Sequence, residues 1–307
     1  MDGDASTLRE PLSDAPGEAA PAWPLACTLC GEGLSRRGNA LVCPRSHSFD
    51  VAREGYVNLL GGRRRPQTLG DSPEMLRARR TFLSRGYYAP LATALAAEAS
   101  AHARRRGGSQ PAIVCDVGCG EGYFTAAVHD GLAASVPGVD VRCYGIDVAR
   151  DAARMAARRY GGIHFAVADT WQRLPLADAT VDVLLNVFAP RNVAEFARVL
   201  RPDGIVLTAI PGTEHLAELR QRWGLLDIEE DKHARLLAAM SASFAASNER
   251  RLRYAVDLSG EAAAEIVAMG PSSRHLSAEV LATIAQAPDL RVGIAFDLLV
   301  FARLQGA

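Results

Sequence analysis

Residues 113–122 read Ile-Val-Cys-Asp-Val-Gly-Cys-Gly-Glu-Gly, an apolar run that ends in an acid and three closely spaced glycines. A short apolar run bounded by turn residues fits a strand that is buried on both faces. Glycine permits tight turns and lets a ligand approach the main chain with no Cβ in the way. The segment predicts a strand, a ligand-binding turn and a helix. The alternative is a tight turn that holds no ligand.

The rest of the chain alternates between apolar runs and stretches with helical spacing. Strands are expected at 113–117, 141–146, 164–168, 181–186, 205–209 and 292–301. Helices are expected at 123–135, 150–160, 193–200 and 215–223, after two helices between 73 and 105. The first of these two begins after an N-cap at Ser72, with Pro73 in its first turn. This alternation indicates an α/β fold with a doubly wound, mostly parallel sheet covered on both faces.

An acid ends each of the first three expected strands: Asp116, Asp147 and Asp169. Ligands of doubly wound sheets bind at the carboxyl ends of strands. Asp116 can orient the glycine-rich turn at 118–122, which we call the glycine loop, or accept hydrogen bonds from a ligand ammonium. Asp147 suits both ribose hydroxyls of an adenosine, and Asp169 can reach an adenine amino group. A single acid at a strand end would be only a helix N-cap, but three in order are better explained by one bound nucleoside.

The glycines follow a G-x-G-x-G spacing, which differs from the G-x-G-x-x-G of dinucleotide-binding proteins. A nicotinamide-dependent dehydrogenase is therefore a distant alternative. With its three acids, the region resembles the class I S-adenosylmethionine methyltransferases. The resemblance implies S-adenosylmethionine as the cofactor and a sheet of seven strands.

The fourth expected strand ends in Asn186-Val-Phe-Ala-Pro-Arg191. In methyltransferases of this fold, that strand end borders the acceptor pocket. Asn186 can hydrogen-bond the edge of a base, and it is the expected positioning residue of the catalytic site. Phe188 or Pro190 can support the face of the base. The alternative is a loop turned by Pro190, with Phe188 in the core.

Three cysteines and a histidine cluster near the N-terminus as Cys27-x2-Cys30-x12-Cys43-x3-His47. Three thiolates and an imidazole form a closed tetrahedral donor set of the kind that holds structural Zn2+. Residues 25–60 contain too few apolar side chains to fold unaided, and zinc can contribute about 10–16 kcal/mol to such a module. We refer to residues 25–60 as the zinc module. The alternative is a set of unrelated free thiols and a surface histidine.

The net charge of −1 hides an uneven distribution along the chain. Residues 1–24 carry −4, residues 25–110 carry +8 and residues 111–307 carry −5. A basic N-terminal third suggests a polyanionic partner, although its arginine clusters could equally be solvated linkers. We expect four segments along the chain: a disordered leader (1–24), the zinc module (25–60), a linker (61–72) and a methyltransferase domain (73–307). The sequence contains neither an apolar run long enough to span a membrane nor a secretory signal, so a cytoplasmic protein is expected.

A more specific resemblance follows from several motifs together. They are the zinc module with Phe49-Asp-Val-Ala-Arg-Glu-Gly-Tyr-Val-Asn-Leu-Leu60, Gly70-Asp-Ser, Ala78-Arg-Arg80, Gly86-Tyr-Tyr88, the glycine loop and Pro211-Gly-Thr-Glu-His-Leu216. From about residue 25 onward the chain resembles the bacterial 23S ribosomal RNA guanine-N1 methyltransferases. The segments 186–192 and 269–275 look closer to the Gram-positive type, which includes the tylosin-resistance methyltransferase. The glycine loop, Gly-Cys-Gly-Glu-Gly, is instead closer to the general form of the family than to the loop of the tylosin-resistance methyltransferase.

The resemblance implies methylation of guanine N1 in a 23S RNA hairpin that lines the peptide exit tunnel. It also implies a zinc module that grips RNA, a homodimer and a link to macrolide resistance. The residues expected to border the cofactor are Tyr88, Asp116, Gly118, Gly120, Glu121, Gly122, Asp147, Asp169 and His215. The reaction needs a base for the N1 proton; the sequence does not identify one, and His215 is a weak candidate. Two rival functions remain open: a small-molecule methyltransferase, and a non-catalytic zinc-containing RNA-binding protein.

Overall fold

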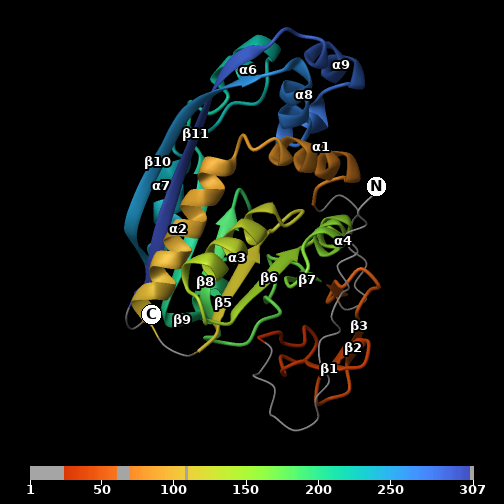
Figure 1. Ribbon diagram of the computed structural model, residues 1–307, viewed down its shortest axis with the longest axis vertical. Coiled ribbons are helices and arrows are strands. Elements are labelled where there is room, and N and C mark those ends of the chain that lie inside the picture. The colour runs from red at the N-terminus through yellow and green to blue at the C-terminus, as the bar shows by residue number, and fades with distance from the viewer. Residues whose placement is uncertain (1–23, 61–69, 108–109, 305–307) are drawn as a thin grey trace, which may run out of the picture.

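The computed structural model describes residues 24–60, 70–107 and 110–304 (Figure 1). The leader expected at 1–24 lies outside the described residues except for Pro24. The linker expected at 61–72 also lies outside them, except for its last three residues.

One large sheet has the strand order β10-β11-β9-β8-β5-β6-β7-β4. The strands from β9 to β4 are parallel, whereas β11 is antiparallel to both of its neighbours. The bounds are β4 (Val57–Asn58), β5 (Ala112–Val117), β6 (Val141–Asp147), β7 (His164–Val167), β8 (Val181–Val187), β9 (Leu200–Pro211), β10 (Phe244–Leu258) and β11 (Leu290–Arg303). The predicted doubly wound, mostly parallel sheet is confirmed. Its seven strands gain an eighth, β4, from the zinc module.

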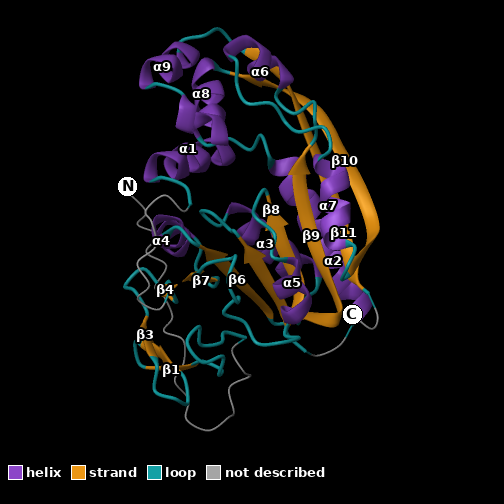
Figure 2. Cartoon of the chain, turned by 180° about the vertical axis from the view of Figure 1, so that it is seen from behind, coloured by secondary structure: helices purple, strands orange, loops and turns teal. Residues whose placement is uncertain are grey.

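Helices cover both faces of the sheet (Figures 1 and 2). One face carries α2 (Ala89–Arg106), α3 (Tyr123–Ser135) and α4 (Arg150–Arg159), and the other carries α5 (Val193–Val199) and α7 (Lys232–Met240). Strand side chains alternate between the two resulting cores, as the pleat requires. The helix predicted at 123–135 has those bounds, and the other predicted helices agree within two residues.

Three helices form a cap beyond the carboxyl ends of the parallel strands (Figure 1). α8 (Gly260–Ala268), the 3-10 turn η1 (Pro271–His275) and α9 (Ala278–Ala285) are inserted between β10 and β11, and α1 (Pro73–Ser84) packs on α8. Ser72 Oγ caps α1 as expected, accepting from Met75 N at 3.2 Å. Arg85 joins α1 to α8 through two hydrogen bonds, of 2.7 and 2.8 Å, to the carboxylate of Glu265. α6 (Ala217–Trp223) follows β9. None of the helices in the described part of the chain is long and apolar enough to cross a membrane.

The zinc module is attached to the edge of the large sheet by main-chain hydrogen bonds. Its three short strands β1 (Ser35–Arg37), β2 (Ala40–Val42) and β3 (Ser48–Asp50) form an antiparallel sheet. Beyond them β4 pairs with β7, and Leu25 bridges to Leu176. Leu25, Leu41 and Phe49 lie in the same core as side chains of the large sheet. The module therefore shares a core with the large sheet, which explains how so few apolar residues suffice.

Candidate cofactor, acceptor and zinc sites

The glycine loop lies between β5 and α3 and has left-handed backbone at three positions, with φ of 85° at Gly118, 54° at Gly120 and 86° at Gly122. At Gly118 a Cβ atom would lie 2.4 Å from Ala189 Cβ, so no larger residue fits there. Ala189 belongs to the loop that follows β8. The glycine loop and this second loop are therefore in direct contact, which places the expected cofactor site against the expected acceptor site.

Asp116 is the buried acid at the end of β5. Its Oδ2 accepts a hydrogen bond of 2.6 Å from Thr125, whereas Oδ1 is buried with no hydrogen-bond partner among the described residues. Burial raises the pKa of this carboxyl to about 7. A buried acceptor without a partner favours binding of a ligand donor. The site therefore suits the ammonium group of an amino acid, as carried by S-adenosylmethionine.

The other two acids lie along the same edge of the sheet. Asp147 accepts hydrogen bonds from Gly120 N at 2.9 Å and from Ala149 N at 2.8 Å, which holds the glycine loop against β6. Burial raises the pKa of Asp147. Asp169 accepts from Trp171 N at 3.0 Å. The three predicted acids thus stand at three neighbouring strand ends, β5, β6 and β7, around one loop. Their roles toward a ligand stay predictions.

Glu121 is the charged residue of the glycine loop and is buried beneath α1. Its Oε2 lies 3.6 Å from Arg80 Nε, and burial raises the pKa of this carboxyl while Arg80 opposes the shift. Arg79 lies beside Gly120 and pairs with Asp71 at 2.5 Å. Sequence reasoning assigned no role to Asp71 or Arg79. Their positions in two of the motifs that carry the family resemblance were the available signal.

Tyr88 and His215, both expected to border the cofactor, are in contact with each other. Tyr88 Oη lies 3.1 Å from His215 Nε2, and His215 Nδ1 accepts from Ala295 N at 3.2 Å. Burial lowers the pKa of His215 to about 3, and it raises the pKa of Tyr88. The ring of Tyr88 also packs edge-on against Phe296, with centroids 4.7 Å apart.

Asn186 is the last residue but one of β8 and is 0% exposed. Its Nδ2 donates to Pro190 O at 2.9 Å and to Val117 O at 3.4 Å, and its Oδ1 is buried without a hydrogen-bond partner among the described residues. The side chain thus ties the loop after β8 to the end of β5. Phe188 does not lie in the core: it is 43% exposed, at the centre of that loop.

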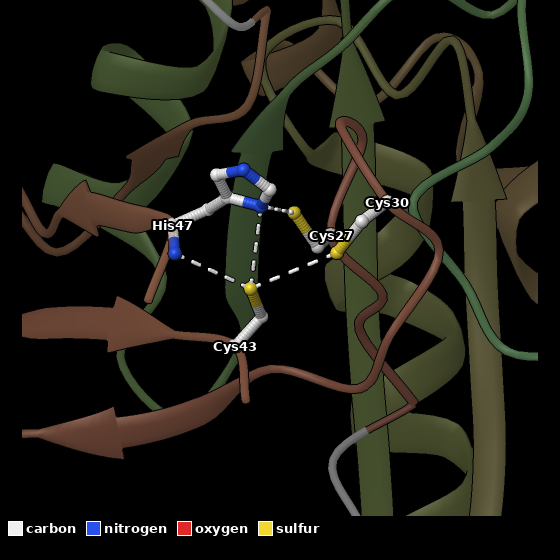
Figure 3. A group of neighbouring side chains, drawn as sticks. All are labelled: Cys27, Cys30, Cys43 and His47. Carbon is white, nitrogen blue, oxygen red and sulfur yellow. Dashed lines mark hydrogen bonds between the residues drawn. The ribbon is translucent and has the colours of Figure 1, made fainter. Parts of the chain in front are cut away.

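The four predicted metal ligands converge (Figure 3). Their ligand atoms all lie within 4.8 Å of one another. His47 Nδ1 is 3.5 Å from Cys27 Sγ and 3.4 Å from Cys43 Sγ, and the Sγ atoms of Cys30 and Cys43 are 3.7 Å apart. Atoms that bind zinc at 2.0–2.3 Å in a tetrahedron stand about 3.5–3.8 Å apart. The spacing and the chemistry of this donor set therefore fit a structural Zn2+.

Comparisons with known proteins cover both the zinc module and the large sheet. Residues 25–64 match the family "RlmA, N-terminal", a zinc ribbon, and residues 114–204 match "Methyltransferase domain". A Micromonospora griseorubida protein that carries the name 23S rRNA (guanine-N(1)-)-methyltransferase is 43% identical over 264 residues, which are 82% of this chain and 87% of the relative. The 23S rRNA (guanine(748)-N(1))-methyltransferase of Streptomyces fradiae is 40% identical over 268 residues, 87% of this chain and 91% of its own.

Among solved structures, loganic acid methyltransferase with SAH has a TM-score of 0.53 and 9% identity, covering 78% of this chain and 99% of its own. At that identity the similarity establishes the fold. The methyltransferase fold and the structural zinc ribbon, both predicted from the sequence, are confirmed.

Proposed function

Since the chain belongs to the family of 23S rRNA (guanine-N1)-methyltransferases, we propose that it transfers a methyl group from S-adenosylmethionine to N1 of a guanine in a 23S rRNA hairpin near the peptide exit tunnel. One observation carries the proposal: the glycine loop with its three neighbouring acids and a zinc ribbon with all four ligands belong to one sheet. A small-molecule methyltransferase needs only the first, and a non-catalytic RNA-binding protein has no use for an intact cofactor site.

We assign the cofactor to the edge formed by β5, β6 and β7. Asp116 Oδ1 would accept from the ammonium group, Asp147 would bind the ribose hydroxyls and Asp169 would reach the adenine amino group. Gly118, Gly120, Glu121 and Gly122 would shape the loop beneath it, and Tyr88 and His215 would also border the cofactor. The bound cofactor supplies an electrophilic methyl group, so the protein's task is to align guanine N1 with it.

Guanine N1 carries a proton at neutral pH, so transfer requires its removal. His215 is poorly suited to this role, because it is neutral and both ring nitrogens have partners inside the protein. Asn186 supports catalysis from beneath the acceptor loop, where its amide fixes the loop rather than touching the base. His215 is therefore not assigned as the base.

We further propose that the chain is divided into a leader (1–24), the zinc module (25–60), a linker (61–72) and a methyltransferase domain (73–307). The zinc module would be the part that binds the RNA. The exposed arginines of β1 support this role. A cytoplasmic location and a homodimer complete the proposal, and macrolide resistance would follow where the methylated guanine lies in the drug site.

Primer extension on 23S rRNA from cells with and without the gene tests the function, because N1 methylation blocks base pairing and stops the polymerase. We expect one new stop in the presence of the gene, absent with an Asp116→Asn variant. An unchanged stop pattern, with methylation found instead on a metabolite, would overturn the proposal. Mass by light scattering and macrolide sensitivity of the same strains test the dimer and the resistance.

A further inference from the structure

Phe188 has a backbone conformation that its surroundings impose. Its φ is 54°, in the left-handed region that bulky residues rarely adopt. Such conformations persist only where neighbouring structure fixes them, and they cluster at functional sites. The residue is also 43% exposed, so packing of its ring in the core does not account for it.

Three contacts hold the loop around Phe188. Asn186 donates to Pro190 O, which closes the loop across Phe188, and Phe188 N donates to Ala209 O on β9 at 3.1 Å. Ala189 rests directly on Gly118 of the glycine loop. The loop after β8 is thereby anchored to β5, to β9 and to the glycine loop.

The ring of Phe188 lies close to three other aromatic rings. Its centroid lies 5.3 Å from that of Phe296, 6.1 Å from that of Phe124 and 6.3 Å from that of Tyr88. These contacts bury part of the ring, while 43% of the residue stays exposed. An aromatic surface of this kind binds nucleobases by stacking, without regard to charge.

The sheet order indicates which ligand this surface receives. The acids Asp147 and Asp169 end β6 and β7, on one side of β5, whereas Phe188 follows β8 on the other side. The adenosine assigned to the acids is therefore separated from Phe188 by the glycine loop. Phe188 therefore lies on the β8 side of the glycine loop, away from the three acids.

We propose that the target guanine, turned out of its stack in the RNA, stacks on the ring of Phe188, and that Asn186 is the positioning residue that holds this ring. The inference rests on the proposed function and adds to it the surface that receives the base. Contact between Ala189 and Gly118 then sets the distance from the base to the methyl donor.

Three variants test the stacking: Phe188→Tyr, Phe188→Leu and Phe188→Met. Methylation of a 23S rRNA hairpin is measured at saturating S-adenosylmethionine, with cofactor affinity and the unfolding midpoint measured on the same samples. The aliphatic variants keep much of the apolar volume but lose the aromatic face, so kcat/KM for RNA should fall about 5- to 100-fold. Phe188→Tyr keeps the aromatic face, so its kcat/KM for RNA should fall less than that of either aliphatic variant, and cofactor affinity should not change.

Leu or Met variants as active as the parent would overturn this inference alone. A loss of cofactor affinity that matches the loss of activity would also overturn it, since the ring would then belong to the cofactor site. Two aliphatic variants keep the test open if one does not fold. A parent protein that methylates no hairpin would instead contradict the proposed function, and with it the base on Phe188.

Discussion

The Nδ1 atom of His215 accepts a hydrogen bond from the main-chain N–H of Ala295 at 3.2 Å. This nitrogen therefore carries no proton, and the ring proton stands on Nε2, which donates to Tyr88 Oη at 3.1 Å. His215 is a neutral cross-link between β11 and the residue that precedes α2.

This neutral histidine should make folding sensitive to acid. Its pKa is about 3 in the folded protein, against a usual 6.5, so its contribution to stability is complete above pH 6.5 and is lost as the pH falls toward 3. One such group changes the free energy of unfolding by about 1.4 kcal/mol per pH unit in that window. His215→Asn should reduce the slope, measured by urea unfolding between pH 4.5 and 7. His275→Asn, at an exposed position, is the control. An equal slope in both variants would contradict the assignment.

Cofactor affinity should rise with pH through the titration of Asp116. In the free protein the carboxyl has a pKa of about 7, so below that pH it is largely protonated and cannot pair with an ammonium group. The affinity for S-adenosylmethionine, measured by calorimetry, should increase from pH 6 to pH 8 and then level off. Asp116→Asn should bind weakly with a flat profile, whereas Asp130→Asn, at an exposed acid, should behave as the parent does. If the affinity of the parent protein does not change with pH, the ammonium group does not bind to Asp116.

Arg253 on β10 should stabilise the loop that carries His215. Its NH2 donates to the buried Asp297 at 2.7 Å, its NH1 donates to Phe296 O at 2.7 Å, and its Nε pairs with Glu214. Arg253→Met leaves Asp297 without this partner, so the free energy of unfolding should fall by about 1–3 kcal/mol. Cofactor affinity should fall as well, because Glu214 precedes His215.

Arg251→Met provides the control, since Arg251 is exposed on the same strand. Adding Asp297→Leu to Arg253→Met should recover part of the stability, because the unpaired acid is removed. If the double variant is no more stable than Arg253→Met, the lost stability comes from packing of the arginine side chain and not from the unpaired acid.

Zinc should be required for RNA methylation and less so for cofactor binding. Cys30→Ser removes one of four ligands, and metal content should fall from one zinc per chain toward zero. Cys143→Ala, at a buried cysteine in the other core, should keep its zinc. We expect the first variant to lose methylation of the hairpin while it still binds S-adenosylmethionine. Full methylation without zinc would contradict the RNA-gripping role of the module.

Binding of the hairpin should depend on salt through the exposed arginines of β1. Log affinity falls as log salt concentration rises, and each phosphate that the protein neutralises adds about 0.7 to 0.9 to the steepness of this fall. Arg37→Ala should reduce the slope by about that much, and Arg291→Ala, exposed on β11 and paired with Asp257, should not. Equal slopes in both variants would place the RNA elsewhere.

The sequence predicted most strands, the glycine loop and the zinc ligands because local spacing specifies them. It missed the four short strands of the zinc module, β1 to β4. It also missed β10, whose middle carries Glu249, Arg250, Arg251 and Arg253. Only the ends of this strand are buried, so it lacks a clean alternation of apolar and polar residues. Charged residues are typical of an edge strand protected from pairing with another chain. The helices α7, α8 and α9 lie in the same part of the chain, between residues 223 and 292, for which the sequence pattern predicts no helix or strand.

Parts of the site also escaped prediction. The contacts of Arg253 with Asp297 and of Arg79 with Met269 O join residues 44 and 190 positions apart. Such partners are set by topology and leave no local pattern. The same holds for Phe188, whose exposure depends on three rings from other elements.

Main-chain pairing of the zinc module with β7 and with residues 175–177 makes the module a fixed extension of the catalytic sheet. An RNA hairpin gripped by the module would meet the methyl donor at a constant offset. The target nucleotide would then be determined by its distance along the RNA from the segment that the zinc module binds. Moving the target guanine by one nucleotide would end methylation even with its neighbouring bases unchanged.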